Sequence, residues 1–345
     1  MTIIAKINKR NRYKKTSLLL AIVLLLFGLT TWIGINSMFR ALDENNQEEY
    51  IVTIKPGAST ASIAQTLAQE NIIDNPNAFR IFSKIKGLDG KLKAGEYLLS
   101  PSMDLEEITK KLLKGQVVSY SFTIPEGYTL RQIAQVLIDK GYVDEDKFWE
   151  VVKNEPFPEF EFLEGLPNDE KRLEGYLFPD TYRITSGMTE QQIVAMMLKR
   201  FQEVYNQLPE NQSGLNFRDT IILASIVELE SKVDRDRPLI ASVFLNRLGI
   251  NMLLQADATL QYAFPERKSR VLYSDLELDS PYNSYKYTGL PPGPIGSPGR
   301  AALEAVHQPA DTDYLYFVAR KDGSGEHVFG RTLAEHNKNR RELGY

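Results

Sequence analysis

Two glutamates, Glu228 and Glu230, lie near the end of the mostly apolar segment 217–231. Asn216 is a suitable N-cap for a helix that begins at Phe217, and the apolar pattern that follows predicts that this helix is buried. A carboxylate on a buried helix is costly unless it is paired, protonated or used in a reaction. These two side chains are therefore candidates for acid–base chemistry.

The spacing of the two glutamates separates their roles. Side chains two residues apart on a regular helix point in nearly opposite directions, so Glu228 and Glu230 cannot both face one pocket. Glu230 continues a row of aliphatic residues, whereas Glu228 continues a row that includes a serine. A structural alternative stays open, in which both glutamates form ion pairs with arginines such as Arg235, Arg237 or Arg247.

A loop rich in glycine and proline follows the helical region. Residues 288–299 contain four Gly and four Pro, which excludes a helix or a central strand and favours an ordered loop that shapes a cleft. The three histidines, His307, His327 and His336, are 20 and 9 residues apart, which fits no zinc pattern. We therefore expect no metal and no cofactor.

The N-terminus predicts a membrane anchor. Residues 16–39 carry no charge and exceed the ~20 residues that span a bilayer. Residues 1–15 contain basic side chains and no acidic ones, which places this tail in the cytoplasm and residues from Arg40 onward outside. A cleaved signal peptide is the alternative, but the apolar run is longer than a signal sequence requires. We expect a single-pass protein of the bacterial cytoplasmic membrane, with a short linker at 40–49.

The composition is that of a globular protein that folds through core burial. The chain is 25% charged and 43% hydrophobic, with a net charge of −4 and no cysteine. Disulfides are therefore excluded, and a mildly acidic chain with basic residues gathered only in its tail is not expected to bind nucleic acid.

An internal repeat follows the anchor. Fifteen aligned pairs, from Thr53/Thr123 to Leu67/Leu137, contain seven identities. Each copy reads as a strand, a glycine turn, a Ser/Thr-capped helix and a second helix, which we place at 77–86 and 144–153. This pattern resembles the LysM fold, a small module that binds N-acetylglucosamine polymers. Spacer units without a ligand are the alternative.

The motifs from Asp219 to Asn337 resemble the endolytic murein transglycosylase family, also called YceG-like. The resemblance rests on several motifs in order, and it extends to the anchor and the repeat region. They are Glu228-x-Glu230, Asn246-Arg247, Leu254-Gln255-x-Asp257, Tyr282-Asn283-x-Tyr285, Gly289-Leu290-Pro291-Pro292-Gly293, Pro298-Gly299, Tyr314-Leu-Tyr-Phe-Val318 and His336-Asn337. Ala258 is a departure, since related chains often have proline there.

The resemblance implies an activity and assigns roles. The family cleaves the bond between N-acetylmuramic acid and N-acetylglucosamine inside nascent strands, which leaves 1,6-anhydro ends. The pair Glu230-Ser231 is similar to the Glu-Ser pair of goose-type-lysozyme-like lytic transglycosylases, so Glu230 takes the catalytic role. The supporting residues are Glu228, Gln255, Asp257 and Asn283, and the substrate-binding residues are Tyr282, Tyr285 and the loop Gly289, Leu290, Pro291, Pro292 and Gly293.

The expected architecture is α+β, with an N-terminal transmembrane helix, LysM-like α/β modules and a catalytic domain that contains a lysozyme-like Glu-bearing helix. We place a LysM-like module at 50–118, a second LysM-like or supporting unit at 119–155 and the catalytic domain at 156–345. Expected partners are peptidoglycan strands and the peptidoglycan synthases of the membrane. Two alternatives stay open: a non-catalytic glycan-binding scaffold, and a hydrolytic muramidase with Asp257 as its second carboxylate.

Overall fold

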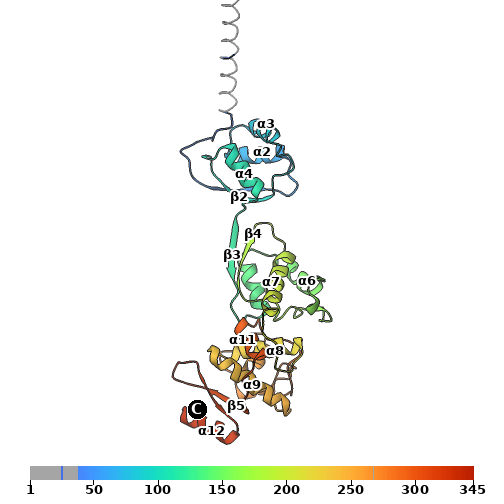
Figure 1. Cartoon of the computed structure of the whole chain (residues 1–345), viewed down its shortest axis with the longest axis vertical. Helices are drawn as coiled ribbons and strands as arrows, with labels where there is room; N and C mark the ends of the chain where they lie inside the picture. The colour runs from blue at the N-terminus through green and yellow to red at the C-terminus, as the bar shows by residue number, and fades with distance from the viewer. Residues whose placement is uncertain (1–24, 26–37, 267) are drawn as a thin grey trace, which may run out of the picture. The chain divides into compact units, whose positions relative to one another are not determined.

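The computed structural model describes residue 25, residues 38–266 and residues 268–345 (Figure 1). Helices and two-stranded sheets are mixed along the chain, as expected for an α+β protein. The described residues form two compact units. The first ends at Tyr120 and includes 184–187, and the second comprises 121–183 and 188–345.

In the described part of the first unit, two strands and three helices lie between Tyr50 and Lys114. They are β1 (Tyr50–Ile54), α2 (Thr60–Gln69), α3 (Pro76–Ile85), β2 (Gly95–Leu99) and α4 (Leu105–Lys114). The strands pair antiparallel, with Tyr50 opposite Leu99 and Ile54 opposite Gly95. Side chains from both strands and all three helices form one buried core, which explains how this unit folds without disulfides.

The second copy of the repeat follows, and all of it except residues 119–120 and 184–187 belongs to the second unit. Its elements are β3 (Ser119–Thr123), α5 (Leu130–Asp139), α6 (Glu145–Asn154), the short helix η1 (Glu161–Leu163), β4 (Thr181–Thr185) and α7 (Glu190–Tyr205). The repeat is confirmed at the level of element order, because each copy runs strand, helix, helix, strand, helix. The second copy differs by a long insertion, residues 155–180, before its closing strand. Strand β4 was not predicted from the sequence, although the alternation in 181–185 is typical of a strand.

The rest of the second unit surrounds the Glu-bearing helix. Its elements are α8 (Phe217–Glu230), η2 (Asp234–Asp236), α9 (Arg237–Gly249), α10 (Asp257–Ala263), η3 (Tyr273–Glu277), α11 (Arg300–His307), β5 (Tyr316–Ala319), β6 (His327–Gly330) and α12 (Leu333–Glu342). The predicted helix α8 is confirmed, with Asn216 as its N-cap and every side chain from Thr220 to Glu228 buried. It packs against α9, α10 and α11.

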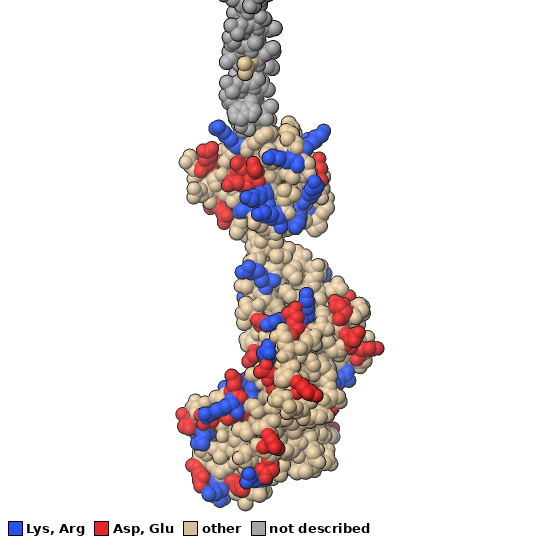
Figure 2. Space-filling view, viewed as in Figure 1, with Lys and Arg blue, Asp and Glu red and all other residues tan. Residues whose placement is uncertain are grey.

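The predicted anchor at 16–39 and the tail at 1–15 lie outside the described residues, apart from Leu25, Met38 and Phe39. In the part of the chain that is described, no helix combines the length and the apolar character needed to cross a bilayer. On the face that Figure 2 shows, acidic and basic side chains are interspersed over both units.

Candidate active site

The end of α8 opens into a cavity of about 840 Å³ inside the second unit. Its walls come from the second repeat, from the insertion, and from α8, α10 and the segment after α10. The lining residues are Gly127, Thr129, Leu130, Arg131, Gln132, Trp149, Glu170, Lys171, Glu174, Leu229, Glu230, Asp257, Ala258, Gln261, Tyr262, Ala263, Phe264, Pro265, Ser269, Arg270, Val271 and Ile295. This volume falls within the range of ~300–1,000 Å³ that is typical of ligand pockets.

Glu230 is the last residue of α8, and its carboxylate faces this cavity. The backbone N–H of Ala258, in the first turn of α10, donates a hydrogen bond to it at 3.3 Å. Burial raises the pKa of Glu230 to about 7, the Ala258 hydrogen bond lowers it, and the negative charge of Asp257 raises it. Glu230 is therefore able to hold a proton near neutral pH and also to accept one, as a general acid–base residue must.

Asp257 shapes this environment from the first position of α10. It lines the cavity and accepts a hydrogen bond from the hydroxyl of Tyr285. The pKa of Tyr285 is raised by burial and by the neighbouring carboxylate of Asp257. The two residues therefore place a fixed negative group beside Glu230, and this group favours the protonated form of the acid.

The Glu228 side chain points away from the cavity, and both of its carboxylate oxygens have structural partners. One carboxylate oxygen accepts from Arg237 at 2.9 Å, and the other accepts from the backbone N–H of Gly299 at 2.9 Å. Both members of this ion pair are buried. The structural alternative is thus correct for Glu228 with Arg237, whereas Arg247 bonds to backbone carbonyls, among them Leu254 at 2.7 Å.

A second buried carboxyl, Glu174, lines the same cavity and was missed in the sequence. It accepts hydrogen bonds from the backbone N–H of Leu130 at 2.9 Å and from the hydroxyl of Tyr262 at 2.9 Å. Burial raises the pKa of Glu174 to about 7, against the lowering effect of these hydrogen bonds. An acidic residue inside an apolar run was the available signal.

The glycine turn of the second repeat is joined to the loop that follows Pro294. Gly127 donates its N–H to Ser297 and Tyr128 accepts the N–H of Ser297, each at 2.8 Å. A Cβ on Gly296 would lie 2.7 Å from the carbonyl oxygen of Gly127, so this approach requires glycine. The turn also packs on Leu229, the neighbour of Glu230. The second repeat therefore holds the Glu230 end of α8 in place.

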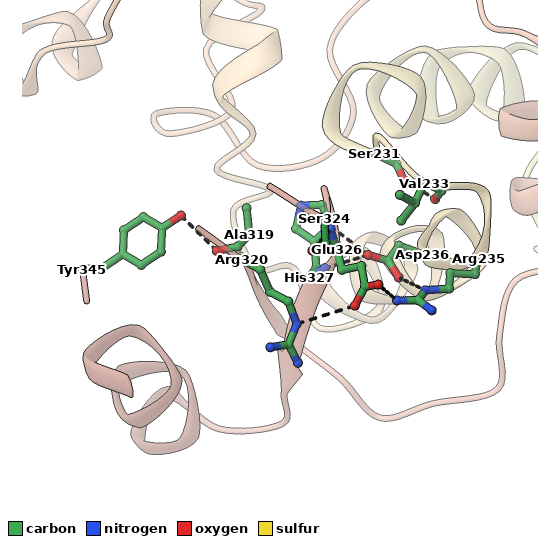
Figure 3. A network of polar contacts seen from close by, with 10 residues as sticks. All are labelled: Ser231, Val233, Arg235, Asp236, Ala319, Arg320, Ser324, Glu326, His327 and Tyr345. Carbon is green, nitrogen blue, oxygen red and sulfur yellow. Dashed lines mark hydrogen bonds and ion pairs between the residues drawn. The ribbon is translucent and has the colours of Figure 1, made fainter. Parts of the chain in front are cut away.

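The segment after Glu230 is fixed by the β5–β6 hairpin (Figure 3). Asp236 accepts hydrogen bonds from the backbone N–H of His327 at 2.7 Å and from its Nδ1 at 3.0 Å. Glu326 lies between Arg235 and Arg320 and pairs with both. These contacts anchor the connection between α8 and α9, and they give the imidazole of His327 a carboxylate partner in Asp236.

The other predicted residues lie at different distances from the cavity. Among the site residues predicted from the sequence, Glu230 and Asp257 line the cavity directly. Asn283 is buried, and its amide donates to the carbonyls of Leu276 and Leu278, so it organises its own loop. Gln255 is exposed, with a positive φ of 50°.

The predicted aromatic and loop residues lie behind or beside the cavity wall. Tyr282 is buried against Tyr262, with ring centroids 4.8 Å apart, and burial raises its pKa to about 12. In the loop Gly289–Gly293, Leu290 and Pro292 line a separate hollow that also involves Tyr287. The geometry therefore gives Tyr282 a supporting position behind Tyr262.

Comparison with known proteins agrees with this arrangement. The model of the YceG-like family matches residues 52–342. An endolytic murein transglycosylase of Bacillus subtilis strain 168 is 38% identical over 318 residues, which cover 88% of this chain and 87% of the relative. An endolytic murein transglycosylase of Streptococcus pneumoniae D39 is 33% identical over 328 residues, covering 86% of this chain and 59% of the relative.

A solved structure is also similar. The crystal structure of a YceG-like protein from Listeria monocytogenes, at 2.6 Å resolution, has a TM-score of 0.54 and 36% sequence identity. The match covers 85% of this chain and 99% of that one. With the family model matching most of its length and these relatives beside it, the chain belongs to the YceG-like family.

Proposed function

We propose that this chain is an endolytic murein transglycosylase, a lyase that cuts peptidoglycan strands between N-acetylmuramic acid and N-acetylglucosamine and so ends strand elongation. One observation carries the proposal: Glu230 holds a carboxyl with a pKa of about 7 in a large cavity. The chain is also 38% identical to a protein of that name.

The first step is protonation of the leaving group. Glu230, protonated, donates its proton to the glycosidic oxygen, and the C1–O bond to the departing N-acetylglucosamine breaks. The 2-acetamido oxygen of the muramic acid stabilises the anomeric carbon, so no second protein carboxylate is needed as nucleophile. The surroundings that raise the pKa of Glu230 keep this proton available near neutral pH.

The second step closes the 1,6-anhydro ring. Glu230, now ionised, takes the proton from the C6 hydroxyl as that oxygen bonds to C1, which regenerates the acid and consumes no water. The Ala258 N–H favours the ionised form, because a hydrogen bond to a carboxylate stabilises its charge. One residue thus performs both proton transfers.

The test is mass spectrometry of peptidoglycan digested by the full chain. Wild-type protein should release fragments with 1,6-anhydro ends, and Glu230→Gln should release none. Glu277→Gln, an exposed change outside the cavity, is the matched control and should behave as wild type. Reducing ends would instead identify a muramidase that uses Asp257, and absence of any product would identify a scaffold.

We propose that the first unit is a LysM-like tether and that residues 16–39 anchor the protein in the membrane. The β1-α2-α3-β2 order and the antiparallel sheet support the first part. The apolar, uncharged run after a basic tail supports the second. The catalytic unit would then work outside the cytoplasmic membrane, where peptidoglycan synthases are the partners that supply nascent strands.

This topology has its own test. A reporter that is active only in the cytoplasm, fused after Tyr345, should be silent, and the same reporter fused before Met1 should be active. Activity of the C-terminal fusion would contradict the proposed orientation.

A further inference from the structure

The cavity that Glu230 faces is also lined by the second repeat, whose Trp149 and Arg131 form part of its wall. Trp149 lies on α6, which packs against α5 and α7, whereas Glu230 lies on α8, which packs against α9, α10 and α11. A space of about 840 Å³ is larger than one sugar ring requires. A glycan strand placed across Glu230 therefore has room for further sugars against this wall.

The two copies of the repeat differ at the positions that face this cavity. Counted from the helix N-caps, Trp149 on α6 replaces Arg80 on α3, and Arg131 on α5 replaces Ala61 on α2. The residue that packs into the core one position before is the same in both copies, Phe79 and Phe148. The second copy thus keeps the core of the repeat and changes its surface.

Trp149 and Arg131 are placed to meet a ligand. The indole is half-buried and lies nearly perpendicular to the ring of Phe148, with 5.4 Å between the ring centroids. Within the described part of the chain, the indole N–H makes no hydrogen bond and the Arg131 guanidinium makes no ion pair, and both residues line the cavity. A partly exposed aromatic ring in a cavity suits stacking on a pyranose ring, and an exposed guanidinium that lines the same cavity suits hydroxyl or acetamido oxygens.

The wall is held rigidly relative to Glu230. Glu174 accepts from Leu130 at the start of α5 and from Tyr262 on α10, the helix whose Ala258 bonds Glu230. Arg172 donates to the carbonyl of Glu155, just after α6, at 2.6 Å. Sugars bound at Trp149 would therefore be positioned against the reacting bond, because a rigid frame joins the two places.

We propose that Trp149 and Arg131 form a separate sugar-binding subsite for the glycan strand that Glu230 cleaves. The indole stacks on an N-acetylated hexosamine other than the two joined by the reacting bond, and Arg131 binds its polar groups. This inference rests on the proposed function and adds a determinant of substrate length: strands long enough to reach Trp149 bind better than shorter ones.

Fluorescence tests the subsite directly. The chain has two tryptophans, so Trp32→Phe leaves Trp149 as the only indole, and Glu230→Gln prevents cleavage during the titration. Uncrosslinked peptidoglycan strands of eight sugars should quench or shift the emission of this full-length double variant in a saturable way. Emission that stays unchanged while the same strands bind in a sedimentation assay would overturn the proposal.

Kinetics separates this inference from the proposed function. Trp149→Ala should raise KM for eight-sugar strands about 10-fold with kcat nearly unchanged, whereas Trp149→Phe should retain most of the affinity. Arg80→Ala, at the equivalent position of the first unit, is the matched control. An unchanged KM in a folded Trp149→Ala protein would refute the proposed subsite, and it would not contradict the proposed transglycosylase activity. If the wild-type protein bound strands but released no anhydro ends, the proposed transglycosylase activity would be refuted instead.

Discussion

Tyr262 donates its hydroxyl hydrogen bond to Glu174 at 2.9 Å, while Ala258, four residues earlier on the same helix, donates its N–H to Glu230 at 3.3 Å. Residues four apart lie on one face of a helix, so one turn of α10 contacts both buried acids of the cavity. The position of α10 therefore sets the surroundings of the Glu230 carboxyl, and through Glu174 it also contacts the start of α5 in the second repeat.

Glu174 is expected to have a structural role, because it connects the start of α5 to α10 through hydrogen bonds. Glu174→Ala should lower kcat by at least about 10-fold, because it leaves the Leu130 N–H and the Tyr262 hydroxyl without their acceptor. Glu174→Gln should retain most activity below pH 7, since an amide can serve both partners and the native carboxyl is largely neutral there. Steady-state kinetics on soluble strands measures both. Equal loss in the two variants would indicate proton transfer by Glu174.

Substitutions of Glu228 and of Glu230 should affect different properties, stability for Glu228 and catalysis for Glu230. Glu230→Gln should reduce the rate by at least ~10²-fold while the protein remains folded. Glu228→Gln should lower the free energy of unfolding by about 3 kcal/mol, because it breaks the buried pair with Arg237. Its activity per folded molecule should stay well above that of Glu230→Gln. Thermal unfolding and product assays on both variants check this, and the reverse ranking would refute the assignment.

The pH dependence of stability should change in Glu230→Gln. The pKa of Glu230 rises from 4.5 to about 7 on folding, so the native state binds this proton more tightly than the unfolded state. The resulting stability is present below pH 4.5 and is lost as the pH rises through 7. Glu230→Gln avoids this loss. The difference in Tm, variant minus wild type, should therefore be larger at pH 8 than at pH 5, and a constant difference would contradict the raised pKa.

The pH dependence of the cleavage activity should follow the ionisation of the Glu230 carboxyl. Cleavage needs protonated Glu230, so kcat/KM should decrease as the pH rises through about 7. Asp257→Asn should shift this decrease to lower pH, because it removes a neighbouring negative charge that raises the pKa of Glu230. Initial rates between pH 5 and pH 9 provide the measurement. A shift to higher pH would be inconsistent with the observed proximity of the two carboxylates.

Gly296→Ala should disturb the contact between the second repeat and α8. Its Cβ would lie 2.7 Å from the backbone oxygen of Gly127, so the turn must move, at a cost of about 1–3 kcal/mol and with reduced activity. Gly249→Ala is the control, because a Cβ there meets nothing within 4 Å and φ is not positive. Comparable effects of the two changes on Tm would mean that the close approach is unimportant.

Removal of residues 50–118 should weaken binding to long strands and leave cleavage of short oligomers largely intact. The first unit has its own core, and a tethered second site acts by raising the local substrate concentration. Binding and cleavage assays on strands of two lengths distinguish a glycan-binding first unit from one with a structural role. An equal loss on both lengths would show that the first unit has a structural role only.

The sequence by itself determined the elements that depend on local pattern. The apolar periodicity and the Asn216 cap predicted α8, the identities between the two copies predicted the repeat, and the Gly/Pro content predicted the loop 288–299. The opposite directions of Glu228 and Glu230 also followed from helix geometry alone. Motif order indicated the family, because several separate matches must coincide.

Only the tertiary structure decided which side chains meet. Glu174, Trp149 and Tyr262 are far apart in the chain, and they line one cavity because the insertion, the second repeat and α10 pack together. The sequence predicted Asn283 as a supporting residue of the site, and only the structure shows that its amide bonds to carbonyls of its own loop. Local sequence encodes how a segment folds and which face it buries. Long-range packing sets what surrounds a carboxyl, and therefore sets its pKa and its role.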